Sequence, residues 1–167
     1  MKNLIFLTFI TATLFSCSKI ETNSPVTINT SNTANISGGL YAQLVQDSST
    51  VSDAFEFAPT GTKIYFRIAK CDLNPEAPCD DYLIYETTSQ GGGFSIDLPV
   101  TNTGVDVEIS LDDFDYTKTI WTQQYNPNTG QNYWVSSQSY KVYNCDDRTI
   151  NLHTNINKVE SFQYYHN

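Results

Sequence analysis

Aspartates form the densest groups of reactive side chains in this sequence. Three of the four cysteines precede aspartates directly, and a further group has no cysteine: Cys71-Asp72, Cys79-Asp80-Asp81, Cys145-Asp146-Asp147 and Asp112-Asp113-Phe114-Asp115. Carboxylate oxygens are the ligands that Ca²⁺ prefers, and a disulfide between Cys79 and Cys145 would bring four carboxylates together. Neither this carboxylate cluster nor the Asp112–Asp115 group has the spacing of a known calcium loop. We therefore expect solvated turn carboxylates, no metal ligands and no cofactor, with calcium as the alternative.

The two histidines, His153 and His166, are the other candidates for acid–base chemistry. His153 lies in the alternating segment INLHT, which is typical of a half-exposed strand residue. The sequence contains no Gly-x-Ser-x-Gly, no His-Glu-x-x-His and no Cys–His pairing of recognisable spacing. Two carboxylates could hydrolyse a glycoside only if the fold placed them across a cleft. We expect no enzymatic activity and assign no catalytic residue.

Aromatic residues are concentrated between positions 120 and 143, where flat rings could stack on sugars or anchor a protein interface. Trp121, Tyr133 and Trp134 are the candidates for ligand contact, and Tyr125, Tyr140 and Tyr143 lie in the same segment. Tryptophan and tyrosine also favour strands, so about half of these rings should point into a core.

The N-terminus has the pattern of an export signal. A charged start, Met1-Lys2-Asn3, precedes an apolar run from Leu4 to Leu14 that is too short to span a bilayer. The following Leu14-Phe15-Ser16-Cys17 resembles the lipobox of bacterial lipoproteins, and the alternative is an ordinary secretory signal. The resemblance implies removal of residues 1–16, acylation of Cys17 (palmitate among the acyl chains) and anchoring in the outer membrane.

The segment after Cys17 is a predicted tether. Residues 17–36 are rich in Ser, Thr and Asn and cannot bury enough apolar surface to fold alone. Cys17-Ser18-Lys19-Ile20-Glu21 also resembles the surface-export signal of Bacteroidetes lipoproteins, although that signal usually has a pair of acidic residues. Whether the domain faces the periplasm or the cell surface stays open.

Residues 37–167 are long enough for one domain with a core and too short for two. The formal net charge of the chain is −9, and it becomes −10 when Lys2 is removed with the signal (8 basic against 18 acidic residues). This charge excludes nucleic acid as a partner, because no basic patch could neutralise phosphates. The expected partners are the membrane, through the lipid anchor, and an envelope protein or a glycan.

The cysteines Cys71, Cys79 and Cys145 predict one disulfide and one thiol, because an exported protein meets an oxidising compartment. Three pairings are open. We favour Cys71–Cys79, because the seven intervening residues include Pro75 and Pro78 and form a loop that a disulfide could close. Cys145 is then a buried free thiol or a partner of either of the others. The spacing does not fit a structural zinc site.

Period-two alternation runs through most of the domain and predicts about seven to eight short strands with turns between them. The segments GTKIYFRI, GFSIDLPV and GVDVEISL show it most clearly, and Asn126-Pro127-Asn128-Thr129-Gly130 is a strong turn signal between two further strands. No helical stripe is convincing. The fold class is therefore all-β, an antiparallel β-sandwich.

The succession Ser37-Gly38-Gly39-Leu40, GTKIYFRI, ETTSQGGGFSIDLP and VDVEISLDDFDY resembles the carboxypeptidase regulatory-like group of transthyretin-like sandwiches over about residues 36–120. An Ig-like sandwich is the alternative fold. The resemblance implies a non-catalytic module, here a membrane-anchored structural or interaction module of the cell envelope. The alternative function is that of a carbohydrate-binding accessory lipoprotein of a polysaccharide-uptake system.

Gly91-Gly92-Gly93 could in principle cradle a phosphate, but a phosphate loop opens a helix, and here a strand pattern follows instead. We predict that these glycines make a positive-φ turn joining strand 82–88 to strand 93–99.

Overall fold

The computed structural model describes residues 26–46 and 53–166 of the chain. Within these ranges the all-β prediction is confirmed, although the strands are more numerous than predicted and a single helical turn is present. The elements are β1 (Thr33–Gln46), β2 (Asp53–Phe57), β3 (Lys63–Ala69), α1 (Lys70–Leu73), β4 (Tyr82–Thr88), β5 (Gly93–Pro99), β6 (Val105–Leu111), β7 (Phe114–Asn126), β8 (Gln131–Asn144), β9 (Arg148–Leu152) and β10 (Asn157–His166).

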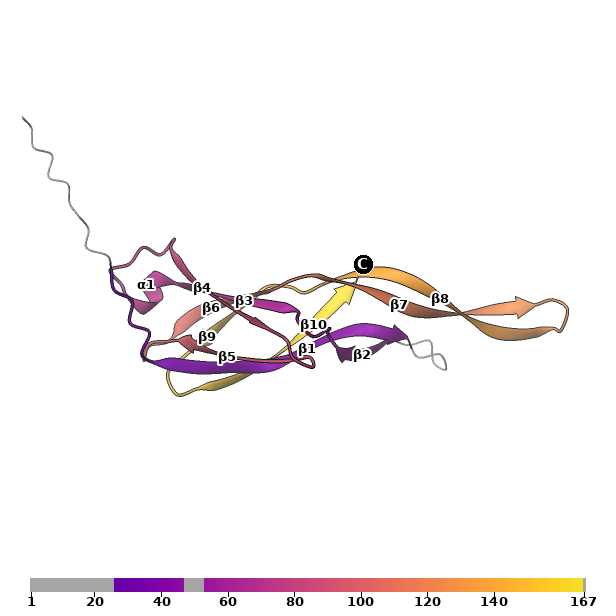
Figure 1. Ribbon diagram of the computed structural model, residues 1–167, viewed down its shortest axis with the longest axis horizontal. Coiled ribbons are helices and arrows are strands. Elements are labelled where there is room, and N and C mark those ends of the chain that lie inside the picture. The colour runs from indigo at the N-terminus through magenta and orange to yellow at the C-terminus, as the bar shows by residue number, and fades with distance from the viewer. Residues whose placement is uncertain (1–25, 47–52, 167) are drawn as a thin grey trace, which may run out of the picture.

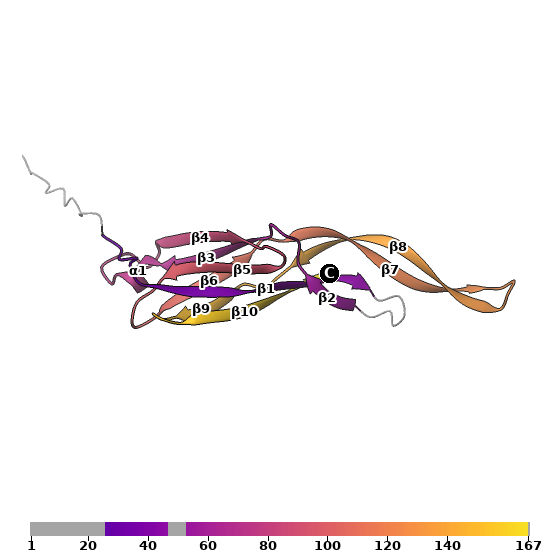
Figure 2. The ribbon, with the colours of Figure 1, turned by 60° about the horizontal axis from the view of Figure 1, so that its bottom comes forward.

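The described strands form two sheets that pack into a sandwich (Figures 1 and 2). One sheet has the order β4-β3-β6-β9, and all of its pairs are antiparallel. The other has the order β2-β1-β10-β8-β7, with β5 also paired to β1. In this second sheet β1 and β10 run parallel, from Asn35 opposite Asn157 to Ala42 opposite Tyr164. An antiparallel sandwich with one parallel pair is therefore the observed architecture.

The alternating strands bury the faces that the sequence predicts. Fully buried side chains come from both sheets, among them Ile64, Phe66 and Ile68 of β3, Val107 and Ile109 of β6, Ile36 and Leu40 of β1, and Phe162 of β10. Phe94 of β5 joins the two layers, because its ring lies 6.2 Å from that of Phe66 and 6.1 Å from that of Phe162. Burial of these apolar faces stabilises the sandwich.

β1 begins earlier than the predicted domain boundary at residue 37. Residues 33–36, which the sequence analysis places in the tether, form the first part of the strand, and Ala34 and Ile36 are buried. The composition of this segment predicts a tether because the polar residues Thr33 and Asn35 alternate with Ala34 and Ile36. In the structure the two polar residues lie on the outer face of the strand. The described residues include no helix that is long and apolar enough to cross a membrane.

The Gly91–Gly92 turn is confirmed, with φ of 57° and 79° at the two glycines. Gln90 and Gly93 pair across it, as in a two-residue turn that needs positive φ at both central positions. The strands that it joins lie in different sheets, since β4 pairs with β3 and β5 pairs with β1. The turn therefore connects the two layers instead of closing a hairpin.

β7 and β8 form a long hairpin that extends well beyond the sandwich (Figure 1). Its base is fixed to the body by three rings, with Phe114 stacked on Tyr143 at 5.2 Å and edge-on to Tyr164 at 4.8 Å. The Tyr143 hydroxyl donates to the Gln43 carbonyl at 2.7 Å, and that of Tyr164 donates to the Asp112 carbonyl at 2.9 Å. Buried, hydrogen-bonded tyrosines hold the direction of the hairpin.

Candidate functional site

The part of the hairpin beyond its base carries no charge. We call residues 119–140 the arm, and none of these 22 residues is Asp, Glu, Lys or Arg in a chain whose net charge is −9. The last buried residue before the arm is Lys118, which is 2% exposed. At about 3.3 Å per residue, the strand from Lys118 to Asn126 spans roughly 26 Å. Figures 1 and 2 show the arm at the end of the molecule opposite to α1 and the first described residues.

The arm ends in the predicted turn. The Gly130 amide donates to the Asn126 carbonyl at 2.9 Å, and the Asn128 amide donates to the Asn126 side-chain oxygen at 2.9 Å. Gly130 has a φ of 71°, a conformation that glycine adopts without strain. This turn fixes the register of the whole hairpin, from Asn126 opposite Gln131 to Phe114 opposite Tyr143.

The register decides which aromatic rings share a face, because residues directly opposite in an antiparallel pair point to the same side. Trp121 lies opposite Ser136, Trp134 opposite Gln123, and Tyr125 opposite Asn132. All three rings therefore lie on one side of the arm, which we call the aromatic face. Trp134 is the diagonal neighbour of both Trp121 and Tyr125, so the three form a continuous row. Tyr125 is 64% and Trp134 40% exposed.

Tyr133 lies on the opposite face of the arm. It is paired with Gln124, and its hydroxyl donates to the Gln124 side-chain oxygen at 3.1 Å. Of the three ring-bearing residues that the sequence analysis selects, the structure brings Trp121 and Trp134 together and separates Tyr133 from them. The third ring on the aromatic face is that of Tyr125, not that of Tyr133. The signal for this was present in the sequence, since counting outward from the Asn126–Gly130 turn assigns each ring to a face.

Tyr140 belongs to the same side of the hairpin but lies nearer its base. A hydrogen bond with Asp115 raises the pKa of the Tyr140 hydroxyl. Tyr140 is opposite Thr117, so the Thr119–Gln138 pair lies between Tyr140 and Trp121. The row of three rings is thus the part of the aromatic face that is farthest from charged groups.

A second uncharged surface lies on the outer side of the larger sheet. It is a shallow groove of about 500 Å³, lined by Ser37, Gly38, Gly39 and Tyr41 of β1, Phe57 of β2, Gln90, Gly91, Gly93 and Phe94 around the glycine turn, and Val159 and Ser161 of β10. None of these residues is charged, whereas three other surface hollows contain ionic groups such as Arg67, Asp112 and Arg148. Within the groove Val159 is 73% and Phe57 55% exposed.

Glycines give the groove its shape. The rings of Tyr41 and Phe57 stack at 5.2 Å with an interplanar angle of 29°. A Cβ at Gly39 would lie 2.8 Å from Cε2 of Tyr41, so the Tyr41 ring lies flat over this glycine. The absence of a side chain at Gly39 therefore lets the Tyr41 ring lie against the β1 backbone, with Phe57 stacked beside it.

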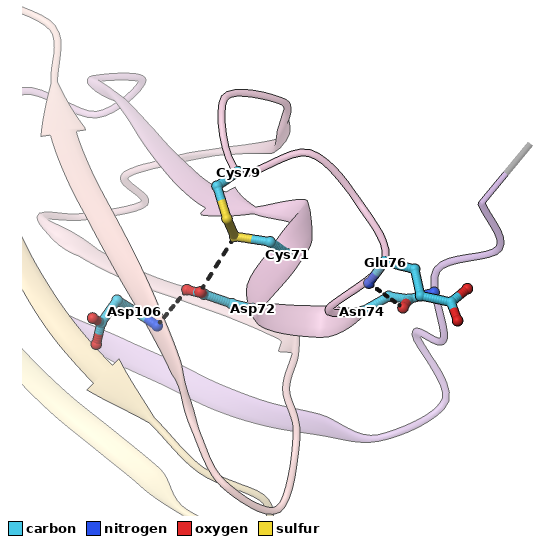
Figure 3. The surroundings of a disulfide bond; sticks show 6 residues. All are labelled: Cys71, Asp72, Asn74, Glu76, Cys79 and Asp106. Carbon is cyan, nitrogen blue, oxygen red and sulfur yellow. Dashed lines mark hydrogen bonds between the residues drawn. A yellow bond between two sulfur atoms is a disulfide. The ribbon is translucent and has the colours of Figure 1, made fainter. Parts of the chain in front are cut away.

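The disulfide joins Cys71 to Cys79, as the sequence analysis favours (Figure 3). It closes the loop between β3 and β4, where Lys70 lies 2.6 Å from the Asp81 carboxylate and its amide donates to the Asp81 carbonyl. The Asn74 side-chain amide donates to the Thr27 carbonyl at 3.1 Å. The disulfide loop therefore lies where the described chain enters the sandwich, at the end far from the arm (Figure 1).

The aspartate groups are dispersed. Asp72 accepts a hydrogen bond from the Asp106 amide at 3.2 Å (Figure 3), and Asp112 accepts one from the Tyr65 hydroxyl at 3.3 Å. Because Cys79 bonds to Cys71, the alternative in which Cys79 and Cys145 gather four carboxylates is not realised. In the described part of the chain, no three His, Cys, Asp or Glu residues are placed to hold a metal ion.

Neither Cys145 nor a histidine lines the groove or belongs to the arm, although Cys145 lines a neighbouring hollow that shares Ser161 with the groove. Cys145 is a free, half-buried thiol, and burial is the main cause that raises its pKa. His153 follows β9 in a loop and is not in a strand, and its ring packs against Gly104. His166 lies edge-on to Tyr143 at 5.3 Å.

Comparison with known proteins does not assign the chain to a family. No protein-family model matches the chain. No curated protein matches it either. The chain is similar to the shaft pilin spaA from Lactobacillus rhamnosus GG, with 10% sequence identity and a TM-score of 0.36, over 81% of this chain and 50% of the pilin. The chain thus spans about half the length of that protein, and nothing of the pilin's assembly is carried over.

Proposed function

We propose that this chain is a lipid-anchored, non-catalytic β-sandwich module of the bacterial outer membrane that presents its arm for recognition. The observation that carries the proposal is the aromatic face: a row of three rings on an uncharged arm that projects from the sandwich. The row begins beside β1, where the Trp121 amide donates to the Gln46 side-chain oxygen at 2.7 Å, and runs outward to Tyr125. Aromatic rings with adjacent amides and hydroxyls are the side chains that anchor protein interfaces and stack on ligands.

The anchor is supported by the lipobox-like Leu14–Cys17 segment, which lies outside the described residues. Acyl chains on Cys17 would hold the chain at the membrane, since two lipid groups give stable anchoring. The first described residues lie at the disulfide end of the sandwich, where the Thr27 carbonyl accepts a hydrogen bond from Asn74. The arm extends from the other end (Figure 1), so it would point away from the bilayer. The finer assignment to the carboxypeptidase regulatory-like group also stays a proposal, supported by Ser37–Leu40 and by the glycine turn.

A carbohydrate ligand is the second candidate for the aromatic face. The row Tyr125, Trp134 and Trp121 is interleaved with Gln123, Asn132 and Ser136, which offer neutral donors and acceptors. A surface without charge suits a neutral polysaccharide, because no ion has to be desolvated when the sugar binds.

The anchor is tested by labelling cells with an alkyne analogue of palmitate and separating membranes from soluble protein. The wild-type chain should carry the label and sediment with the outer membrane, whereas Cys17→Ser should do neither. Equal labelling of Cys17→Ser would contradict the anchor. Protease treatment of intact cells then distinguishes surface display, in which the arm is cleaved, from a periplasmic orientation, in which it is protected.

The carbohydrate candidate is tested by electrophoresis through gels that contain neutral polysaccharides. Trp134→Ser should abolish any retardation shown by the wild type, whereas the matched Tyr133→Ser on the opposite face should retain it. Retardation that survives Trp134→Ser, or its absence with every glycan, would exclude the aromatic face as a sugar site.

A further inference from the structure

The arm and the groove are two uncharged, aromatic surfaces on one strongly acidic chain. They lie on different elements, since the arm is the tip of β7 and β8 and the groove is built on β1, β2, β5 and β10. The arm extends beyond the other strands (Figures 1 and 2), and the rings around Phe114 fix its direction. A contact between the two surfaces therefore requires two molecules.

We propose that the aromatic face of the arm in one molecule binds the groove of a second copy of the chain. This inference rests on the proposed use of the arm for recognition, and it names the partner.

Charge favours a second copy at these surfaces. Two chains of net charge −9 repel each other, and a contact that buried more carboxylates would be disfavoured. The 22 residues of the arm and the eleven residues that line the groove carry no charge, so their contact desolvates no ion. Glu160, which lies between Val159 and Ser161 of the groove, is held by Arg148 at 2.8 Å.

Shape and chemistry also match. The arm is a two-stranded ribbon, and the groove is a shallow trough in which the Tyr41 ring lies flat over Gly39. Its ring row would meet the Tyr41–Phe57 stack, and aromatic pairs with centroids about 4.5–7 Å apart stabilise a contact beyond the area they bury. Val159, the most exposed residue of the groove at 73%, would be covered at the same time.

The symmetry of such a contact follows from its two different surfaces. Each molecule offers one arm and one groove, so the contact is head-to-tail and extends into a chain or closes into a ring. A contact between two identical arms would instead stop at a dimer.

Three single substitutions of matched chemistry test this arrangement in the full chain, purified in detergent. Tyr125→Glu places a carboxylate on the arm, Val159→Glu places one in the groove, and Ile84→Glu places one on the outer face of β4 in the other sheet. The three side chains are 64%, 73% and 65% exposed, so each variant should fold. Circular dichroism and the unfolding temperature of each variant verify this directly.

Analytical ultracentrifugation, with the micelle contribution held constant, measures the association. The wild type and Ile84→Glu should form dimers and larger species with rising concentration. Tyr125→Glu alone and Val159→Glu alone should associate at least tenfold more weakly. An equal mixture of these two variants should form a one-to-one dimer and nothing larger, because the intact groove of one copy receives the intact arm of the other.

The other outcomes overturn the inference. A wild type that stays monomeric has no such contact. Loss of association in Tyr125→Glu, together with dimers of Val159→Glu alone, whose arm is intact, indicates arm-to-arm pairing. Loss of association in Ile84→Glu would show that the two surfaces are not responsible. A monomeric wild type whose aromatic face still binds a glycan or another protein would overturn the second copy as partner and leave the proposed function standing.

Discussion

The ring of Phe57 occupies the space in which a Cβ at Gly92 would stand. A methyl group at position 92 would overlap the Cβ, Cγ and Cδ1 atoms of Phe57. Gly92 also has a φ of 79°, which side-chain-bearing residues rarely adopt, and its carbonyl accepts the Leu40 amide at 2.8 Å. Gly92 thus has two roles. Its positive φ allows the turn between the sheets, and its lack of a side chain leaves room for the Phe57 ring at the groove.

Gly92→Ala should therefore destabilise the chain more than Gly91→Ala. Both positions have positive φ, which costs an alanine about 1–2 kcal/mol, but a Cβ at Gly91 would have no atom within 4 Å. The overlap with Phe57 should add about 1–3 kcal/mol at position 92. Chemical denaturation of both variants measures the difference. Equal losses would contradict the packing of Phe57 on Gly92, and combining Gly92→Ala with Phe57→Ala should remove most of the excess.

Replacing both disulfide cysteines should lower the free energy of unfolding by about 2–3 kcal/mol, because the bond limits the entropy of a short loop in the unfolded chain. The measurement is the denaturation midpoint of Cys71→Ser combined with Cys79→Ser. A reducing agent should lower the midpoint of the wild type to that of the double variant and leave the double variant unchanged. A wild type that is insensitive to reductant would contradict this role.

Truncation of the aromatic face should leave stability nearly intact, whereas a change at the base of the arm should not. Trp134→Ser should change the free energy of unfolding by less than about 0.5 kcal/mol, since this ring is 40% exposed on an arm without a core. Tyr143→Phe should cost about 1 kcal/mol, because the Gln43 carbonyl loses its donor. Thermal unfolding of both variants distinguishes them. A large loss in Trp134→Ser would indicate a structural role for the row.

The Cys145 thiol should react slowly with iodoacetamide in the folded chain. Burial raises its pKa above the ordinary value, so the reactive thiolate is scarcer at each pH than in the unfolded chain. The half-maximal alkylation rate should therefore lie at higher pH for the folded chain than for the chain in denaturant. Between these two pKa values the unfolded chain has lost the proton and the folded chain keeps it, so stability falls as pH rises. Identical pH profiles would contradict the burial.

The sequence predicts the β6 strand and the glycine turn well, because their signals are local. Val105, Val107, Ile109 and Leu111 alternate with polar residues and are all buried. The turn needs only three glycines and the strand pattern that follows. The parallel pairing of β1 with β10 is different, because it joins residues more than 100 positions apart and has no local signature.

The arm and the groove also cannot be predicted from local sequence patterns. The segments 119–125 and 132–140 belong to predicted strands, and their sequence pattern does not show that they extend beyond the sandwich. The groove brings Gly39 next to Ser161 and the 90–93 turn, a juxtaposition that only the sheet order creates. The absence of charge from 119 to 140 is visible in the sequence, and it becomes informative once the hairpin is known to project from the sandwich.

The most direct test of the account is photo-crosslinking in cells that make the full chain. A photoreactive amino acid at Gln123 would lie on the aromatic face beside Trp134, and at Gln124 it would lie on the opposite face beside Tyr133, one residue nearer the turn. We expect crosslinked products from position 123 and few from position 124, with a second copy of the chain as the captured species. Equal yields from the two positions, or products from position 124 alone, would contradict recognition by the aromatic face.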